Sequence, residues 1–168
     1  LTTSLGSDGS GAEVLIIPGG GSRNPATQET VTDDLHTIHM KGREVFRFAT
    51  RVMARAAKEV AKEANVRIED VALFVPHQAN ERIIEVASKS LKLNGDRVYS
   101  NLQHYGNTSA ASIPIALCEA IEEERISPGD RVILVGFGGG LTWGAALIQW
   151  EASIPLAPFP RWKRVWLW

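Results

Sequence analysis

The sequence predicts an α/β fold in which helices pack against a mixed β-sheet. Two short apolar runs, 71–75 and 131–137, are bounded by turn residues and have the length of buried strands. Amphipathic segments lie before and between these runs, which is typical of parallel strands joined by crossover helices. A third apolar run, 141–150, follows the second after the glycine triplet 138–140, so we expect a closing hairpin.

The first part of the chain predicts a strand and a long helix. Residues 13–17 form a short apolar run, and the segment 18–25, rich in glycine and proline, ends it. The polar segment 27–39 is hard to assign. Residues 42–64 predict a helix that ends near Asn65. Its apolar face consists of Val45, Phe46, Ala49, Val52, Met53, Ala56, Val60 and Ala64.

The middle of the chain alternates strand and helix. The apolar run 71–75 stops at Pro76, and residues 79–93 predict a second helix, which Asn94-Gly95 ends. Residues 98–105 are expected to be a short strand or loop.

A third helix is expected to follow. Thr108 and Ser109 are good N-cap residues, and the helix should extend to about residue 124. Pro114 lies beyond the first turn of that helix, so it should kink the helix or shift its start. Pro128-Gly129-Asp130 then forms the turn into the strand 131–137.

Residues 1–150 are expected to form one domain and residues 151–168 to lie outside it. This tail contains three prolines and three of the five tryptophans of the chain, with basic residues between them. Such a tail could bind a membrane surface or a partner, but we favour an unstructured appendage.

Composition excludes several classes of protein. The 168-residue chain has 44% hydrophobic and 22% charged residues, which is typical of a globular protein. Its net charge of −1 argues against a dedicated nucleic-acid binder but leaves room for a local basic face. The lone Cys118 excludes an internal disulfide and fits a reducing compartment. No apolar run is long enough to span a membrane, and no signal peptide is recognisable. The chain starts at Leu1 rather than at Met, and the turn-rich run 6–11 follows. We therefore expect a fragment or subunit of a larger protein.

Polar, glycine-rich segments follow the predicted strands, where ligand sites of α/β sheets lie. They are 76–80 (PHQAN), 104–112 (HYGNTSAAS) and 136–140 (GFGGG). Each is weak alone, because a histidine there is often structural, an asparagine often caps a helix and a glycine triplet is usually a turn. Together, an imidazole and a carboxamide at neighbouring strand ends can direct two N–H donors at one oxygen and stabilise an enolate or oxyanion.

Three motifs give this arrangement a specific resemblance. They are VPHQANERI, HYGNTSAASIP and GFGGGLTWGAALI, and they are accompanied by SDGSGAEVLIIPGGGSRNP and MKGREVFRFA. In order and spacing, these motifs are similar to those of β-ketoacyl-acyl-carrier-protein synthase III. The resemblance covers residues 1–150 and implies the C-terminal half of a thiolase-like, five-layer αβαβα fold. It also implies an acyltransferase that condenses acyl-CoA with malonyl-acyl-carrier protein to start fatty-acid synthesis.

The resemblance assigns roles to individual residues. It implies that His77 and Asn107 are catalytic and stabilise the carbanion formed as carbon dioxide leaves the malonyl group. It places Phe137 at the malonyl carboxylate and Gly138 and Gly139 beside the acyl-cysteine. Asn80 is a further substrate-binding residue. It implies neither a cofactor nor a metal.

The nucleophile of the family is a cysteine in the N-terminal half. Cys118 is a poor substitute, because Glu119, Glu122 and Glu123 lie near it in sequence and would raise the thiol pKa. We therefore expect Cys118 to be inert, and the chain alone to be inactive without the N-terminal half.

The first long helix carries a basic stripe opposite its apolar face. The stripe consists of Arg43, Arg47, Arg51, Arg55, Lys58 and Lys62. A solvated surface is the simpler interpretation for most of these residues. Carrier proteins are acidic, however, and Arg47 and Arg82 align with family positions implied in carrier-protein docking, with Lys89 a weaker addition.

The resemblance also implies a homodimer in the complete protein, formed through the N-terminal half, in the cytoplasm or a plastid. We expect no nucleic-acid or membrane partner. Two other functions stay open: a sister thiolase-fold acyltransferase of secondary metabolism, and a non-catalytic half that binds a carrier protein. An isolated half should expose apolar surface and be prone to association.

Overall fold

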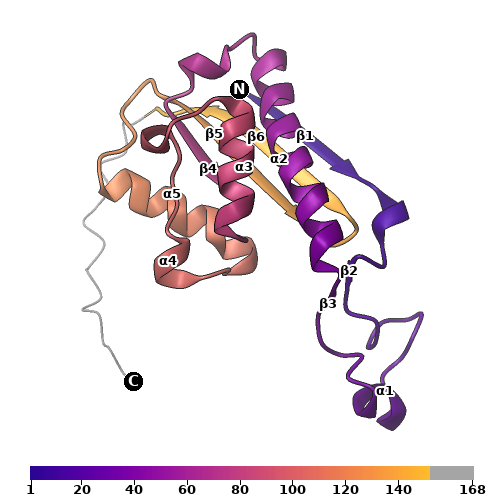
Figure 1. Cartoon of the computed structure of the whole chain (residues 1–168). Coiled ribbons are helices and arrows are strands. Elements are labelled where there is room, and N and C mark those ends of the chain that lie inside the picture. The colour runs from indigo at the N-terminus through magenta and orange to yellow at the C-terminus, as the bar shows by residue number, and fades with distance from the viewer. Residues whose placement is uncertain (152–168) are drawn as a thin grey trace, which may run out of the picture.

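A four-stranded mixed sheet forms the centre of the computed structural model, which describes residues 1–151. Its strand order is β1 (Thr2–Ser7), β6 (Thr142–Gln149), β5 (Arg131–Gly138) and β4 (Leu73–Pro76), as Figure 1 shows. β4 and β5 are parallel, whereas β5–β6 and β6–β1 are antiparallel. The predicted α/β class and the closing hairpin are therefore confirmed.

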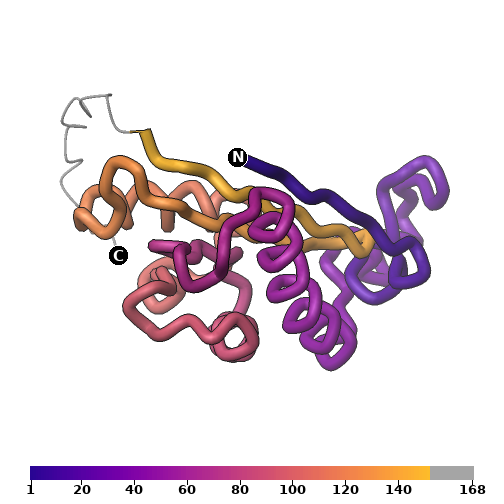
Figure 2. The backbone as a smooth tube through the Cα atoms, turned by 90° about the horizontal axis from the view of Figure 1, so that it is seen from above, coloured from indigo at the N-terminus to yellow at the C-terminus, as the bar shows by residue number. Residues whose placement is uncertain are grey.

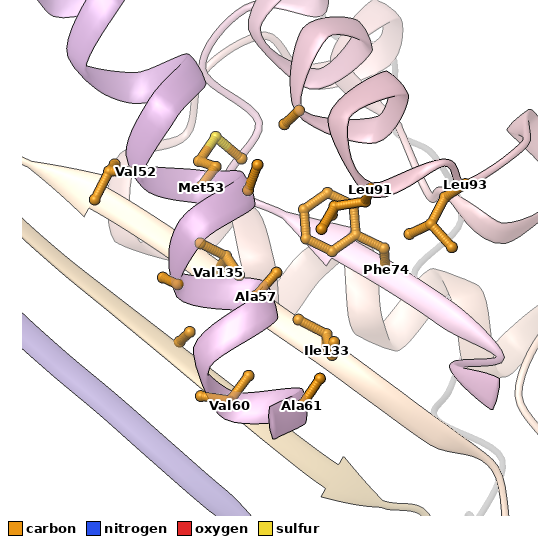
Figure 3. Packing of buried hydrophobic residues seen from close by; sticks show 14 of the residues in the cluster. Val52, Met53, Ala57, Val60, Ala61, Phe74, Leu91, Leu93, Ile133 and Val135 are labelled. Carbon is orange, nitrogen blue, oxygen red and sulfur yellow. The ribbon is translucent and has the colours of Figure 1, made fainter. Parts of the chain in front are cut away.

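Two helices cover one face of the sheet. α2 (Gly42–Glu63) and α3 (Glu81–Leu91) lie on the same side of the strands (Figure 2). The apolar face of α2 packs on strand residues such as Phe74, Ile133 and Val135 in the main hydrophobic cluster (Figure 3). Phe74 is completely buried there. The predicted apolar stripe of α2 is thus the stripe that covers the sheet.

The opposite face of the sheet carries α5 (Ser112–Glu122). Its Ala116 and Ala120 pack against Leu73, Val75 and Val132 in a second cluster. Because both faces of β4 are covered, all four of its residues are buried, as expected of a parallel strand between helices.

An excursion between β1 and α2 extends away from the sheet (Figure 1). It contains β2 (Leu15–Ile16), the short helix α1 (Gln28–Thr32) and β3 (His39–Met40), and β2 pairs with β3. The strand predicted over 13–17 therefore exists in shortened form. The polar segment 27–39, unassigned from sequence, holds α1, which a capping box between Thr27 and Thr30 stabilises.

Three sequence predictions are wrong or incomplete. No strand was predicted before the turn-rich run 6–11, but Thr2–Ser7 is strand β1, because the backbone pairs with β6. The segment 98–105 includes a short helix, α4 (Leu102–Tyr105), and only Val98 bridges to the sheet, next to Phe74.

The third prediction concerns the start of α5. Neither Thr108 nor Ser109 caps this helix; Ser109–Ala111 is a separate 3-10 turn and α5 begins at Ser112. Pro114 therefore falls in the first turn, where its missing N–H removes no intrahelical bond. Of the two effects expected of Pro114, the shifted start is the one observed.

Within residues 1–151, no helix has the length and apolar character needed to cross a bilayer. The predictions for residues 152–168 lie outside the described part of the chain.

Candidate functional site

A cleft of about 840 Å³ opens at the carboxyl ends of β4 and β5. His77, Asn107 and Phe137 all border it. Three segments separated by about 30 residues each in the chain therefore meet at one opening, as predicted from their positions after strands.

His77 is the first residue after β4, and its main chain is fixed by the neighbouring strand. Its backbone N–H donates to the carbonyl oxygen of Val135 in β5 at 2.7 Å. The imidazole ring meets the Phe137 ring edge to face, with 5.3 Å between the centroids. Burial lowers the pKa of His77 below its usual value, which favours a neutral ring at pH 7.

Asn107 reaches the cleft from the loop between α4 and α5. The loop turns at Gly106, whose φ of 66° and ψ of −156° suit glycine. The Asn107 side-chain oxygen accepts a hydrogen bond from the backbone N–H of Ser109 at 2.9 Å. Since the oxygen is engaged in this turn, the amide NH2 group is the part of Asn107 left for a ligand.

Two residues of the site lie in the predicted polar segments 76–80 and 104–112, but sequence reasoning gave them no role. Ser112 lies with its Oγ 2.6 Å from His77 Nδ1, and Gln78 is completely buried beside it. The Gln78 side chain donates to the carbonyl oxygens of Pro76 and Tyr99, so it fixes the backbone that carries His77. The signal for Ser112 was Pro114, because a helix start shifted by this proline places Ser112 in the first turn, at the cleft.

The predicted substrate-binding residues divide into two groups. Phe137, Gly138 and Asn80 border the cleft, and Asn80 also caps α3 by accepting from the backbone N–H of Arg82 at 3.0 Å. Gly139 does not line it. A Cβ at Gly139 would lie 2.9 Å from the carbonyl oxygen of Leu15, so the absence of a side chain here allows the β2 backbone to approach.

One wall of the cleft is apolar and comes from segments that the sequence prediction did not connect with the site. It includes Leu5 of β1, Leu15 of β2, Met40 of β3 and Phe46 of α2. Met40 is 59% exposed, so it can contact a ligand that enters from solvent. The wall suits the apolar part of an elongated substrate.

The three predicted docking residues are exposed, but they differ in their ionic partners. Lys89 forms an (i, i+4) ion pair with Glu85 at 3.7 Å. In the described part of the chain, Arg47 and Arg82 take part in no ion pair within 4.0 Å. Arg47 and Arg82 therefore keep more of their charge available for an acidic partner.

Cys118 lies on α5 and does not border the cleft. Burial, together with the nearby carboxylates of Glu122 and Glu119, raises the pKa of its thiol. Its Sγ is 3.8 Å from Glu122 Oε1. These surroundings disfavour a thiolate, in agreement with the expectation from sequence.

A second hollow, of about 910 Å³, lies between α3, α4 and α5. It is lined by Glu81, Glu119 and Glu123, among others, and of the predicted site residues only Lys89 borders it. Glu119 is already engaged, because Asn101 Nδ2 donates to it at 2.8 Å and the Tyr105 hydroxyl donates to it as well. Across residues 1–151, no three His, Cys, Asp or Glu side chains are grouped to hold a metal ion.

The model of the 3-oxoacyl-[acyl-carrier-protein] synthase III C-terminal family matches residues 61–150, more than half of the chain, including His77, Asn107 and Phe137. The chain belongs to this family. The resemblance seen in its motifs is therefore confirmed.

Relatives of this family agree with the match. The β-ketoacyl-[acyl-carrier-protein] synthase III of Clostridioides difficile is 53% identical over 150 residues, which make up 89% of this chain and 46% of the relative. The solved structure of the Thermus thermophilus synthase III is 46% identical, with a TM-score of 0.76 over 89% of this chain and 45% of that chain. That of Pseudomonas aeruginosa is 33% identical, with a TM-score of 0.81 over 92% and 46%.

The chain thus spans about half the length of the relatives that it matches. The likeness to their structures confirms the predicted fold, the C-terminal half of a thiolase-like architecture with a mixed sheet between helices.

Proposed function

We propose that this chain supplies the histidine and asparagine of a 3-oxoacyl-acyl-carrier-protein synthase III, which condenses acyl-CoA with malonyl-acyl-carrier protein. The observation that carries the proposal is that His77 and Asn107 border one cleft while their other polar atoms are held by the protein. Family membership supports the same reaction.

The chemistry follows from the two donors. When the malonyl thioester loses carbon dioxide, the electron pair of the broken C–C bond delocalises onto the thioester oxygen as an enolate. A neutral imidazole N–H of His77 and an amide N–H of Asn107 can both donate to that oxygen. The enolate carbon then attacks an acyl thioester, forms the new C–C bond and releases the thiolate of the enzyme's cysteine.

Phe137 contributes by excluding water. Its ring contacts His77 and presents an apolar edge to the cleft, which disfavours a charged malonyl carboxylate relative to neutral carbon dioxide. We propose that Phe137, the main-chain turn at Gly138 and the Asn80 amide together bind the substrate.

The acylated cysteine belongs to the N-terminal half in this proposal. Cys118 is unsuited because its thiol pKa is raised and it lies outside the cleft. The chain alone is therefore inactive in condensation. The complete enzyme is a homodimer formed through the N-terminal half, and it works in the cytoplasm or in a plastid without a metal or cofactor.

The proposal is tested by joining the chain to an N-terminal half of the family that carries the cysteine. In that protein His77→Ala and Asn107→Ala should each lower kcat for malonyl-carrier-protein decarboxylation by about 100- to 1000-fold, the usual effect of losing one oxyanion donor. Release of carbon dioxide from labelled malonyl-carrier protein is the measurement.

Cys118→Ser serves as the control and should leave condensation unchanged. Decarboxylation that survives both alanine substitutions would overturn the catalytic assignment and favour a half that only binds the carrier protein. Condensation by residues 1–168 alone would contradict the missing nucleophile.

Docking of the carrier protein gives a separate prediction. Arg47→Glu and Arg82→Glu should each raise KM for malonyl-carrier protein by about tenfold, because they reverse charges that attract an acidic partner. KM for acyl-CoA should not change. Lys89→Glu should act more weakly, since Glu85 already offsets its charge.

Lys62→Glu is the matched control for these variants. It lies on the same helix as Arg47 but about 22 Å further along the axis, at a rise of about 1.5 Å per residue. If all three exposed positions raise KM equally, the effect is one of net charge and the docking assignment fails.

A further inference from the structure

Ser112 connects the start of α5 with the imidazole at the end of β4. Its side chain is almost completely buried, with 2% of the residue exposed. The Oγ atom lies 2.6 Å from His77 Nδ1, although the two residues are 35 positions apart in the chain. A buried contact this short between a hydroxyl and a ring nitrogen requires that one of them donate a hydrogen.

Two donor directions fit this contact. Either the Ser112 hydroxyl donates to Nδ1, or an Nδ1–H donates to the Ser112 oxygen.

The other partner of Ser112 decides between the two directions. The backbone N–H of Gln78 donates to Ser112 Oγ at 3.3 Å. If His77 Nδ1–H also donated to Oγ, the hydroxyl hydrogen of Ser112 would need another acceptor, and in residues 1–151 no carbonyl or carboxylate accepts from it. With the hydroxyl donating to Nδ1, every polar hydrogen of this buried group is used.

We propose that Ser112 is a positioning residue that donates its hydroxyl hydrogen to His77 Nδ1 and thereby keeps the imidazole proton on Nε2. A neutral imidazole carries one N–H, so an Nδ1 that accepts leaves Nε2 as the donor. The contact with Phe137 and the main-chain bond to Val135 hold the ring in this orientation.

The consequence for the cleft rests on the proposed function. With the proton on Nε2, His77 offers a hydrogen-bond donor to an enolate oxygen. With the proton on Nδ1, Nε2 would present a lone pair instead and repel the same oxygen. Ser112 would then decide whether the ring assists decarboxylation, without touching the substrate.

The tautomer can be measured on the chain itself, without any activity. Nitrogen NMR of protein labelled in histidine, at about pH 8 where the usual histidine pKa leaves the ring neutral, distinguishes a protonated from an unprotonated ring nitrogen. His77→Asn assigns the signals by their disappearance. We expect wild-type His77 to show an unprotonated Nδ1 and a protonated Nε2. A protonated Nδ1 in the wild type overturns the proposal.

Ser112→Ala and Ser112→Thr provide the matched comparison. The alanine variant loses the hydroxyl and should show a mixture of both tautomers, whereas the threonine variant retains a hydroxyl and should keep the proton on Nε2. Circular dichroism checks that each variant is folded. If the alanine variant keeps the wild-type tautomer, Ser112 does not set it.

Activity of the chain joined to its N-terminal half separates this inference from the proposed function. Ser112→Ala should lower kcat for decarboxylation by about 10- to 100-fold with little change in KM, and threonine should restore most of it. If the tautomer changes as expected but decarboxylation does not, Ser112 still positions His77, and it is the use of His77 as an enolate donor that fails.

Discussion

Asn107 shows how one hydrogen bond changes the role of a residue. From sequence, a capping role was the more common interpretation of this asparagine taken alone. In the structure its oxygen does accept a backbone N–H, that of Ser109, but the acceptor stabilises a turn before α5 and not the helix itself. The same bond holds the amide beside the cleft.

His77 gives a prediction about pH at the residue scale. Its pKa is lowered in the folded protein by burial, so below the usual value of 6.5 the unfolded chain binds a proton that the folded chain does not. Stability should therefore fall as the pH drops from about 6.5 towards the lowered pKa of the folded state, and should not depend on His77 above that window.

Urea unfolding of the chain and of His77→Asn, measured between pH 8 and pH 5 in steps of about half a unit, tests this sign. The difference in stability between the two proteins should shift in favour of the variant as the pH falls. A constant difference across the window would show that burial does not affect His77 protonation.

At the scale of elements, the C-terminal end of α3 gives a prediction about stability. Lys92, the residue that caps this end, has a φ of 57°, in the left-handed region where a side chain is strained. Lys92→Gly should therefore raise the free energy of unfolding by about 0.5–1 kcal/mol. Chemical denaturation measures the change.

Lys92→Ala is the control, because it removes the lysine side chain but keeps a Cβ in the same conformation. It should change stability by less than about 0.5 kcal/mol. Equal stabilisation by glycine and alanine would attribute the effect to the loss of charge and not to backbone strain.

At the same scale, the spacing of apolar residues along α5 can be compared with the face of the helix that packs on the sheet. Its polar residues are few in the first turns, so apolar side chains lie on several of its faces, as in a helix buried on all sides. It packs on β4 and β5 through the buried Ala116 and Ala120, and the partly buried Ile113, Leu117 and Ile121 pack against the same cluster.

At the scale of the whole molecule, the sheet exposes an apolar edge at β1. β1 is an edge strand. Leu5 within it and Leu1 just before it are 84% and 65% exposed, on the face away from α2. An unpaired apolar edge promotes association between chains. We expect the chain on its own to bind the dye ANS and to self-associate in sedimentation experiments.

Leu5→Lys should reduce both effects markedly while changing unfolding stability by only about 0.5 kcal/mol, because the side chain is already exposed. Val86→Lys is the control, since Val86 is 42% exposed but lies on α3, away from the edge strand. A monomeric chain that binds no ANS would show that this surface is not adhesive.

Local sequence patterns were enough to predict the strands β4, β5 and β6, the long helix α2 and the three motifs of the cleft. These follow from local rules: apolar runs of strand length, a 3.6-residue period, and turn residues between them. The family motifs could likewise be recognised from the sequence.

Tertiary structure alone decided the rest, because the deciding contacts join residues far apart in the chain. Thr2–Ser7 is a strand only because β6 pairs with it. The apolar wall of the cleft combines β1, β2, β3 and α2. Ser112 gains its contact with His77 only when the start of α5 meets the end of β4, since a hydrogen bond across 35 residues has no local signature in sequence.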